Sequence, residues 1–190
     1  MNSRWRTALA AVLLSALAFP ATATTALQMS EQNLVDDSDL IVVGQCDEVE
    51  SLWVDGDLVT VATLDVTESL KGAVGARVDV VLPGGIDAGA PVPVAVTWPG
   101  APSISPGETV LVFLVDFPTV PGGYAVAGFS QGKYSVIEGP AGATSRVSRD
   151  LADLTLVDGE SRHRGAASEE RLDSFLARVR TMVAGGEVER

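Results

Sequence analysis

Alternating hydrophobic and polar residues predict that most of this chain forms β-strands. Within residues 58–68, apolar residues such as Ala62 and Leu64 alternate with polar ones, so one face of the strand is expected to be buried and the other wet. Similar patterns predict strands over 40–49, 76–82, 109–115, 124–128 and 133–137, with weaker candidates at 92–98 and 154–157. The pair Asp55-Gly56 favours a type I′ hairpin turn, because both central residues of that turn need positive φ. The first three strands are therefore predicted to form a meander.

Two segments have helical spacing instead. Residues 29–38 predict a short helix, and residues 168–183 place apolar side chains at intervals of three and four. Ser168 is a suitable N-cap for the second helix, and Gly185 is a suitable end. We expect this amphipathic helix to pack across the sheet, and we expect the polar stretch 139–167 before it to be largely irregular.

The N-terminus has the three-part order of an export signal. The basic start MNSRWR leads into an apolar run over residues 8–19, which small residues follow. That run is shorter than the ~20 residues that span a bilayer, so we expect no membrane span after the signal is removed. Two A-x-A-like sites end at Ala23 and Ala26, so the mature chain is predicted to begin near Thr24 or Leu27.

Removal of this leader would make an already acidic chain more acidic. The whole protein has 13 Lys and Arg against 25 Asp and Glu, and without Arg4 and Arg6 the 11 remaining basic residues face the same 25 acids, a net charge of −14. Phosphate binding depends on clustered Lys and Arg, so the composition argues against nucleic-acid partners. We interpret the acidity as a source of solubility, with an acidic docking face as the alternative.

A single cysteine and a single histidine limit the chemistry that the chain can perform. Cys46 cannot form an internal disulfide, and with His163 as the one imidazole a zinc site of the His/Cys type cannot be assembled. Cys46 falls on the apolar side of its predicted strand and is interpreted as a small buried hydrophobe. The acidic clusters at 36–39 and 55–57 lack EF-hand spacing, so we interpret them as solvated acids rather than calcium ligands.

Residues 128–132, Gly-Phe-Ser-Gln-Gly, match the G-x-S-x-G pattern of hydrolase nucleophile elbows. Downstream candidates for the rest of a triad are Asp150, Asp153, Asp158 and His163. An elbow needs a strand, a sharp turn and then a helix, whereas residues 133–137 predict a strand and His163 lies in the polar stretch SRHRG. A hairpin turn is therefore favoured, and a hydrolase using Ser130 or an acid pair is kept as the rival interpretation.

An ordered set of motifs resembles a family of uncharacterised exported bacterial proteins. The motifs are SDLIVVG at 38–44, LKG at 70–72, PGG at 83–85, GETVLVFL at 107–114 and QGK at 131–133. The first three strands are also similar to netrin-like and metalloproteinase-inhibitor domains, which are OB-type barrels. That similarity implies a barrel and suggests a secreted metalloprotease as partner. The inhibitor mechanism is not carried over, because its N-terminal cysteine has no counterpart at Thr24 or Leu27.

Taken together, these patterns predict a mainly β protein. Residues 1–26 are the expected signal peptide, 27–138 an OB-like antiparallel barrel with a short N-terminal helix, 139–167 an irregular polar connection, and 168–184 a helix packed on the barrel. No catalytic, cofactor-binding or metal-binding residue is identified, so we expect a periplasmic or extracellular binding or accessory module that is not an enzyme. A structural cell-surface protein is a further alternative. Glycine lets backbone amides approach a ligand, and the loops expected to bind a partner contain Pro83, Gly84, Gly85, Gln131, Gly132 and Lys133.

Overall fold

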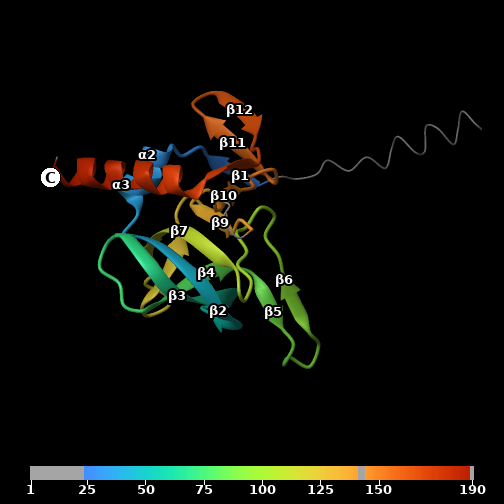
Figure 1. The fold of residues 1–190 in the computed structure, drawn as a ribbon. Coiled ribbons are helices and arrows are strands. Elements are labelled where there is room, and N and C mark those ends of the chain that lie inside the picture. Colours follow the sequence, from blue (N-terminus) through green and yellow to red (C-terminus); the bar gives the residue numbers. More distant parts are fainter. Residues whose placement is uncertain (1–23, 141–143, 189–190) are drawn as a thin grey trace, which may run out of the picture.

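The protein is mainly β, as predicted. The computed structural model describes residues 24–140 and 144–188 (Figure 1). The predicted signal peptide lies outside these residues, apart from its last three, which belong to the first strand. The elements in chain order are β1 (Thr24–Leu27), α2 (Glu31–Asp37), β2 (Leu40–Val54), β3 (Asp57–Lys71), β4 (Arg77–Pro83), β5 (Gly85–Asp87), β6 (Val94–Val96), β7 (Thr109–Asp116), β8 (Gly123–Val126), β9 (Lys133–Ile137), β10 (Arg146–Arg149), β11 (Leu154–Asp158), β12 (Ser161–Arg164), β13 (Ser168–Arg171) and α3 (Leu172–Val188).

Five strands hydrogen-bond to one another in a ring. β2 pairs antiparallel with β3 and β7, and β3 pairs antiparallel with β4. β8 pairs in parallel with β4 and antiparallel with β7, so the pairing returns to its start. The predicted meander of the first three strands is confirmed. Its first turn uses Asp55 at φ 51° and Gly56 at φ 93°, the positive values that a type I′ turn requires.

One hydrophobic core takes alternate residues from all five strands of the ring. Its buried members are Leu40, Val42, Cys46, Ala62, Leu64, Val78, Val80, Leu82, Ile104, Val110, Val112, Leu114 and Val126. Cys46 is 1 % exposed, and burial, followed by the charges of Glu108 and Asp47, raises the pKa of its thiol. The interpretation of Cys46 as a small buried hydrophobe is therefore confirmed.

A second core lies between the helices and the opposite side of β2 and β7. Ile41 and Phe113, which alternate with residues of the first core, pack there against Phe175 of α3. The predicted C-terminal helix thus packs on the sheet, but it begins at Leu172 rather than Ser168. The reason is that residues 168–171 pair with β10 as strand β13.

The stretch expected to be irregular, residues 139–167, contains three strands instead. Val147 of β10 is 1 % exposed, and β10 lies between β9 and β13. Leu154 and Leu156 of β11 are buried, and β11 pairs with β1 and β12. β10 and β12 have only four residues each, so their local pattern was too short to predict them, whereas β11 coincides with the weak candidate at 154–157.

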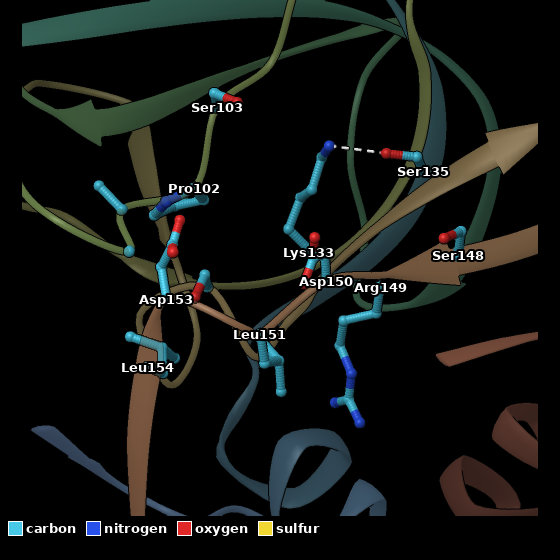
Figure 2. Close-up of a pocket in the computed structure, with 13 residues that line it drawn as sticks. Pro102, Ser103, Lys133, Ser135, Ser148, Arg149, Asp150, Leu151, Asp153 and Leu154 are labelled. Carbon is cyan, nitrogen blue, oxygen red and sulfur yellow. Dashed lines mark hydrogen bonds between the residues drawn. The ribbon is translucent and has the colours of Figure 1, made fainter. Parts of the chain in front are cut away.

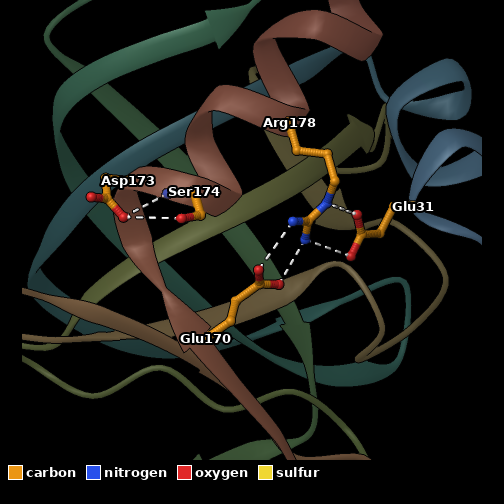
Figure 3. A network of polar contacts seen from close by, with 5 residues as sticks. All are labelled: Glu31, Glu170, Asp173, Ser174 and Arg178. Atoms are coloured by element: carbon orange, nitrogen blue, oxygen red, sulfur yellow. Dashed lines mark hydrogen bonds and ion pairs between the residues drawn. The ribbon is translucent and has the colours of Figure 1, made fainter.

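Arg178 of α3 ties both helices to the sheet (Figure 3). Its guanidinium donates to Glu31 of α2, with Nε 2.7 Å from Oε2, and to Glu170 of β13, with Nη2 2.6 Å from Oε1. Each carboxylate accepts two of these hydrogen bonds, and the guanidinium carbon also lies 5.2 Å from the centre of the Phe175 ring. Such bidentate pairs fix orientation as well as charge, so Arg178 sets how α3 lies against α2 and β13.

Tyr134 is expected to make the folded protein less stable at alkaline pH. Burial raises the pKa of Tyr134 from 10.0 to about 12. Between these pH values the unfolded chain loses a proton that the folded protein keeps, so unfolding becomes more favourable as pH rises, by about 2–3 kcal/mol over the whole interval. We expect Tyr134→Phe to remove this loss in denaturant unfolding measured from pH 10 to pH 12. An unchanged pH dependence in the variant would contradict this assignment.

Candidate functional site

Two neighbouring hollows are the candidate sites. The apolar pocket has a volume of about 350 Å³, and its lining includes Val59, Val81, Pro83, Trp98, Phe117 and Phe129. The polar pocket has a volume of about 230 Å³, and its lining includes Ser103, Ser130, Lys133, Ser135, Asp150 and Asp153. Pro102 lines both, so the two hollows share a wall.

The floor of the apolar pocket is the outer face of strands β3, β4 and β8. Val59 lies opposite Pro83 across the β3–β4 ladder, and Val81 lies opposite Ala125 across the β4–β8 ladder. The chain neighbours of Val81 belong to the first core, so Val81 itself points to the other side of the strand. Among the described residues that line this pocket, none belongs to α2 or α3. The helices therefore leave this part of the sheet open.

Aromatic side chains form the walls of the apolar pocket. Trp98 is 53 % exposed, although tryptophan usually buries most of its surface. Phe129 has φ 66°, a left-handed conformation that costs a non-glycine residue free energy. The strained turn between β8 and β9 therefore places Phe129 at the pocket, where it faces the same hollow as Trp98 and Phe117.

The arm formed by β5 and β6 (residues 85–96) leads the chain to Trp98. Figure 1 shows this arm projecting on the side away from the helices. Gly84 has φ +87°, and a Cβ there would lie 2.4 Å from the carbonyl oxygen of Val96, so only glycine permits the arm to return this closely. Trp53 Nε1 donates to Asp87 Oδ2 at 2.8 Å, which fastens the arm to β2 and lowers the pKa of Asp87.

Lys133 and Ser135 of the polar pocket form a closed triangle of hydrogen bonds with Glu108, and Figure 2 shows its Lys133–Ser135 side. Lys133 Nζ donates to Ser135 Oγ at 2.8 Å and to Glu108 Oε1 at 2.6 Å, and Ser135 Oγ donates to the same carboxylate oxygen at 2.7 Å. Burial by itself raises the pKa of Glu108, but the bonds from Lys133 and Ser135 outweigh it and leave the pKa below its usual value. The Lys133 ammonium is thus held by a carboxylate, an unsuitable arrangement for a general base.

The structure does not bring together the residues of a hydrolase triad. Ser130 is 8 % exposed and lines the polar pocket, as do Asp150 and Asp153. His163 is exposed on β12 and lines neither pocket. The turn that carries Ser130 leads into strand β9, as predicted, so the helix that a nucleophile elbow needs does not follow it.

The first predicted partner-binding loop contributes to the apolar pocket. Pro83 and Gly84 line it. Gly85 begins β5, and a Cβ there would lie 2.6 Å from Ser51 Oγ, so this glycine serves the close packing of the arm on β2. The prediction therefore found one edge of the hollow but not its aromatic walls.

The second predicted loop, residues 131–133, makes contacts within the protein. Gln131 is 1 % exposed, and its side chain accepts from Met29 N at 2.9 Å and donates to the Leu27 carbonyl at 2.8 Å. A Cβ at Gly132 would lie 2.8 Å from the Ala127 carbonyl oxygen. The Gln131 amide is therefore not available to a partner, because it holds the N-terminal segment in place. Lys133 instead reaches into the polar pocket.

Within residues 24–140 and 144–188, no three His, Cys, Asp or Glu side chains lie close enough together to hold a metal ion. No helix in the described part of the chain is long and apolar enough to cross a membrane. Trp98, Phe117 and Phe129, which lie far apart in the sequence, share the apolar pocket. Sequence reasoning did not identify Phe117, because an aromatic residue after a strand carries no signal of its own.

No known protein family matches the chain, and no curated protein is significantly similar to it.

Proposed function

We propose that the protein is an exported binding module, without catalysis, that takes an apolar group of a partner into the apolar pocket. The observation that carries this proposal is the hollow of about 350 Å³ walled by Trp98, Phe117 and Phe129. Pockets of this size with aromatic walls are typical ligand sites, and aromatic residues supply much of the binding energy at interfaces. The sequence resemblance makes a secreted metalloprotease the favoured class of partner.

The order of strands in the ring supports assigning it to an OB-like barrel. An OB-fold is a five-stranded Greek-key barrel whose ligands contact its second and third strands and the loops after its first and fourth strands. In the ring those loops are the turn between β2 and β3 and the connection between β7 and β8. Asp57 and Phe117, which flank these two connections, both line the apolar pocket. The proposed binding site therefore falls where this fold usually binds its ligands.

The polar pocket supports the rival hydrolase interpretation less well than the apolar pocket supports a binding role. Ser130 lacks a helix after its turn, and His163 lies on exposed strand β12. A general base must come within hydrogen-bond reach of the proton it removes. Lys133, the cationic neighbour of Ser130 in this pocket, is bound to Glu108. A binding role thus agrees better with the geometry.

Export is the second part of the proposal, and the structure favours one cleavage site. All four residues of β1 pair with β11, and Gln28 N donates to the Val157 carbonyl oxygen at 2.8 Å. Cleavage after Ala26 would remove three residues of this strand, whereas cleavage after Ala23 keeps it whole. We expect intact-mass analysis of the exported protein to give Thr24 as the first residue. A mature chain that begins at Leu27 would contradict this prediction.

Affinity capture from the exported proteins of the native host tests the binding role. We expect one protein to co-purify in a stoichiometric amount with the wild type, and its recovery to fall about tenfold or more with Trp98→Ala, because aromatic anchors dominate such interfaces. Ile137→Ala is the matched control, since Ile137 is 46 % exposed and lines neither pocket.

Equal recovery with both variants would contradict a role for the apolar pocket. Recovery of further copies of the same chain alone would instead favour the structural surface protein.

A further inference from the structure

The charges near the apolar pocket indicate the chemical class of the partner. We propose that the pocket receives an apolar side chain of a protein segment in which Lys or Arg residues flank that side chain. This inference rests on the proposed function and adds the chemical class of the partner.

The apolar pocket lies entirely in a part of the chain that lacks cations. Residues 38–70 and 78–132 contain no Lys or Arg and twelve Asp or Glu. Every residue that lines the pocket comes from these two stretches. An approaching partner therefore meets an apolar hollow whose lining includes the carboxylate of Asp57 and no cation.

Three carboxylates at or near the pocket have no ion-pair partner among the described residues. They are Asp55, Asp57 and Asp116. Asp57 lines the hollow, Asp55 is two residues away across the β2–β3 turn, and Asp116 directly precedes Phe117.

Four other acids of the same stretches take part in ion pairs. Arg77 pairs with Asp47 and Asp65, Arg180 pairs with Glu68, and Lys133 pairs with Glu108. No such ion pair neutralises Asp57 at the pocket or Asp55 and Asp116 near it, so their negative charge can attract a cationic segment.

The apolar hollow and the negative charge near it contribute differently to recognition. Burial of an apolar side chain against Trp98, Phe117 and Phe129 supplies affinity in proportion to the area removed from water. Exposed charges add less affinity, but they speed association and disfavour partners of the same sign. The same negative field repels nucleic acids and anionic lipid surfaces. A basic protein segment with an apolar residue satisfies both features.

Calorimetric titration of the mature protein with three capped peptides at low salt tests this inference. The peptides are Lys-Lys-Leu-Lys-Lys, Glu-Glu-Leu-Glu-Glu and Lys-Lys-Ser-Lys-Lys. We expect the basic leucine peptide to bind about tenfold more tightly than either of the others, because each of the others lacks one of the two features. We also expect added salt to weaken the binding of the basic leucine peptide.

Two variants assign these preferences to residues. Asp57→Asn should narrow the preference for the basic over the acidic leucine peptide, and Phe117→Ala should abolish the preference for leucine over serine. Asp153→Asn is the matched control, because Asp153 is an exposed acid that lines the polar pocket instead.

The outcomes separate the two proposals. Equal affinity for the basic and acidic leucine peptides would overturn the basic partner and leave the apolar pocket as a binding site. Equal affinity for the basic leucine and basic serine peptides, or no binding of any of the three peptides, would overturn the proposed function together with this inference.

Discussion

Replacing Phe175 by alanine is expected to destabilise the protein by about 3–5 kcal/mol, the cost of truncating a large core aromatic residue. Phe175 is completely buried, and its ring centre lies 4.6 Å from that of Tyr134 and 6.5 Å from that of Phe113. Its removal leaves a cavity between α3 and the sheet that rigid strands cannot fill. Denaturant unfolding monitored by circular dichroism measures the loss.

Thr181→Ala on the same helix is the control for Phe175→Ala. Thr181 is exposed, so its substitution should change the free energy of unfolding by less than about 0.5 kcal/mol. A loss below about 1 kcal/mol for Phe175→Ala would contradict the packing of α3 on the sheet.

Changing Gln131 to glutamate is expected to cost about 2–4 kcal/mol at neutral pH. The carboxylate has the shape of the amide, but it cannot donate to the carbonyl oxygens of Leu27 and Gly128 that Gln131 contacts at 2.8 and 3.1 Å. It would also place an unpaired charge at a position that is 1 % exposed. Denaturant unfolding measures the total loss, and hydrogen exchange at Gln28, whose amide bonds to β11, measures the loosening of β1.

The loss of stability caused by Gln131→Glu should depend on pH in a defined direction. Burial would raise the pKa of the new carboxyl above that of the unfolded chain, so the variant should recover stability as pH falls toward ~4 and lose it as pH rises. Gln131→Met, which removes the hydrogen bonds without adding a charge, should show a smaller loss that does not change with pH. Equal losses for the two variants at neutral pH would contradict the burial of the introduced charge.

Local patterns in the sequence were sufficient to predict the first half of the ring. Strict alternation around Ala62 and Leu64 marked a half-buried strand, and Asp55-Gly56 marked the turn, because few residue pairs accept positive φ twice. Spacing of apolar residues likewise predicted α3. These features depend on residues close together in the chain, which is why one sequence was enough to find them.

The closure of the ring depends on residues far apart in the chain. β4 and β8 pair in parallel through Val80 and Tyr124, and such a pairing leaves no turn signal in the sequence. β10 and β12 were missed because they have only four residues each, whereas β11, which pairs with β1 more than a hundred residues away, coincides with the weak candidate at 154–157. Short strands of this kind are stabilised by their partners and hardly at all by their own composition.

The candidate site was predicted only at its edge. PGG at residues 83–85 pointed to the apolar pocket because glycine signals close backbone approach. At QGK, the Gln131 amide instead hydrogen-bonds to the N-terminal segment. Exposure cannot be read from residue type: Trp98 is half exposed, whereas Tyr134 is 3 % exposed. The aromatic walls depend on two backbone features that residue type does not reveal: the strained turn at Phe129 and the return of the arm at Gly84.

Methyl and amide chemical shifts, followed by NMR while Lys-Lys-Leu-Lys-Lys is added, test most directly whether the apolar pocket is the binding site. The account predicts that the changes concentrate on Val59, Val81, Ala125 and Val126, which line that pocket. Changes that concentrate on Ser130, Ser148 and Leu151 of the polar pocket would contradict it.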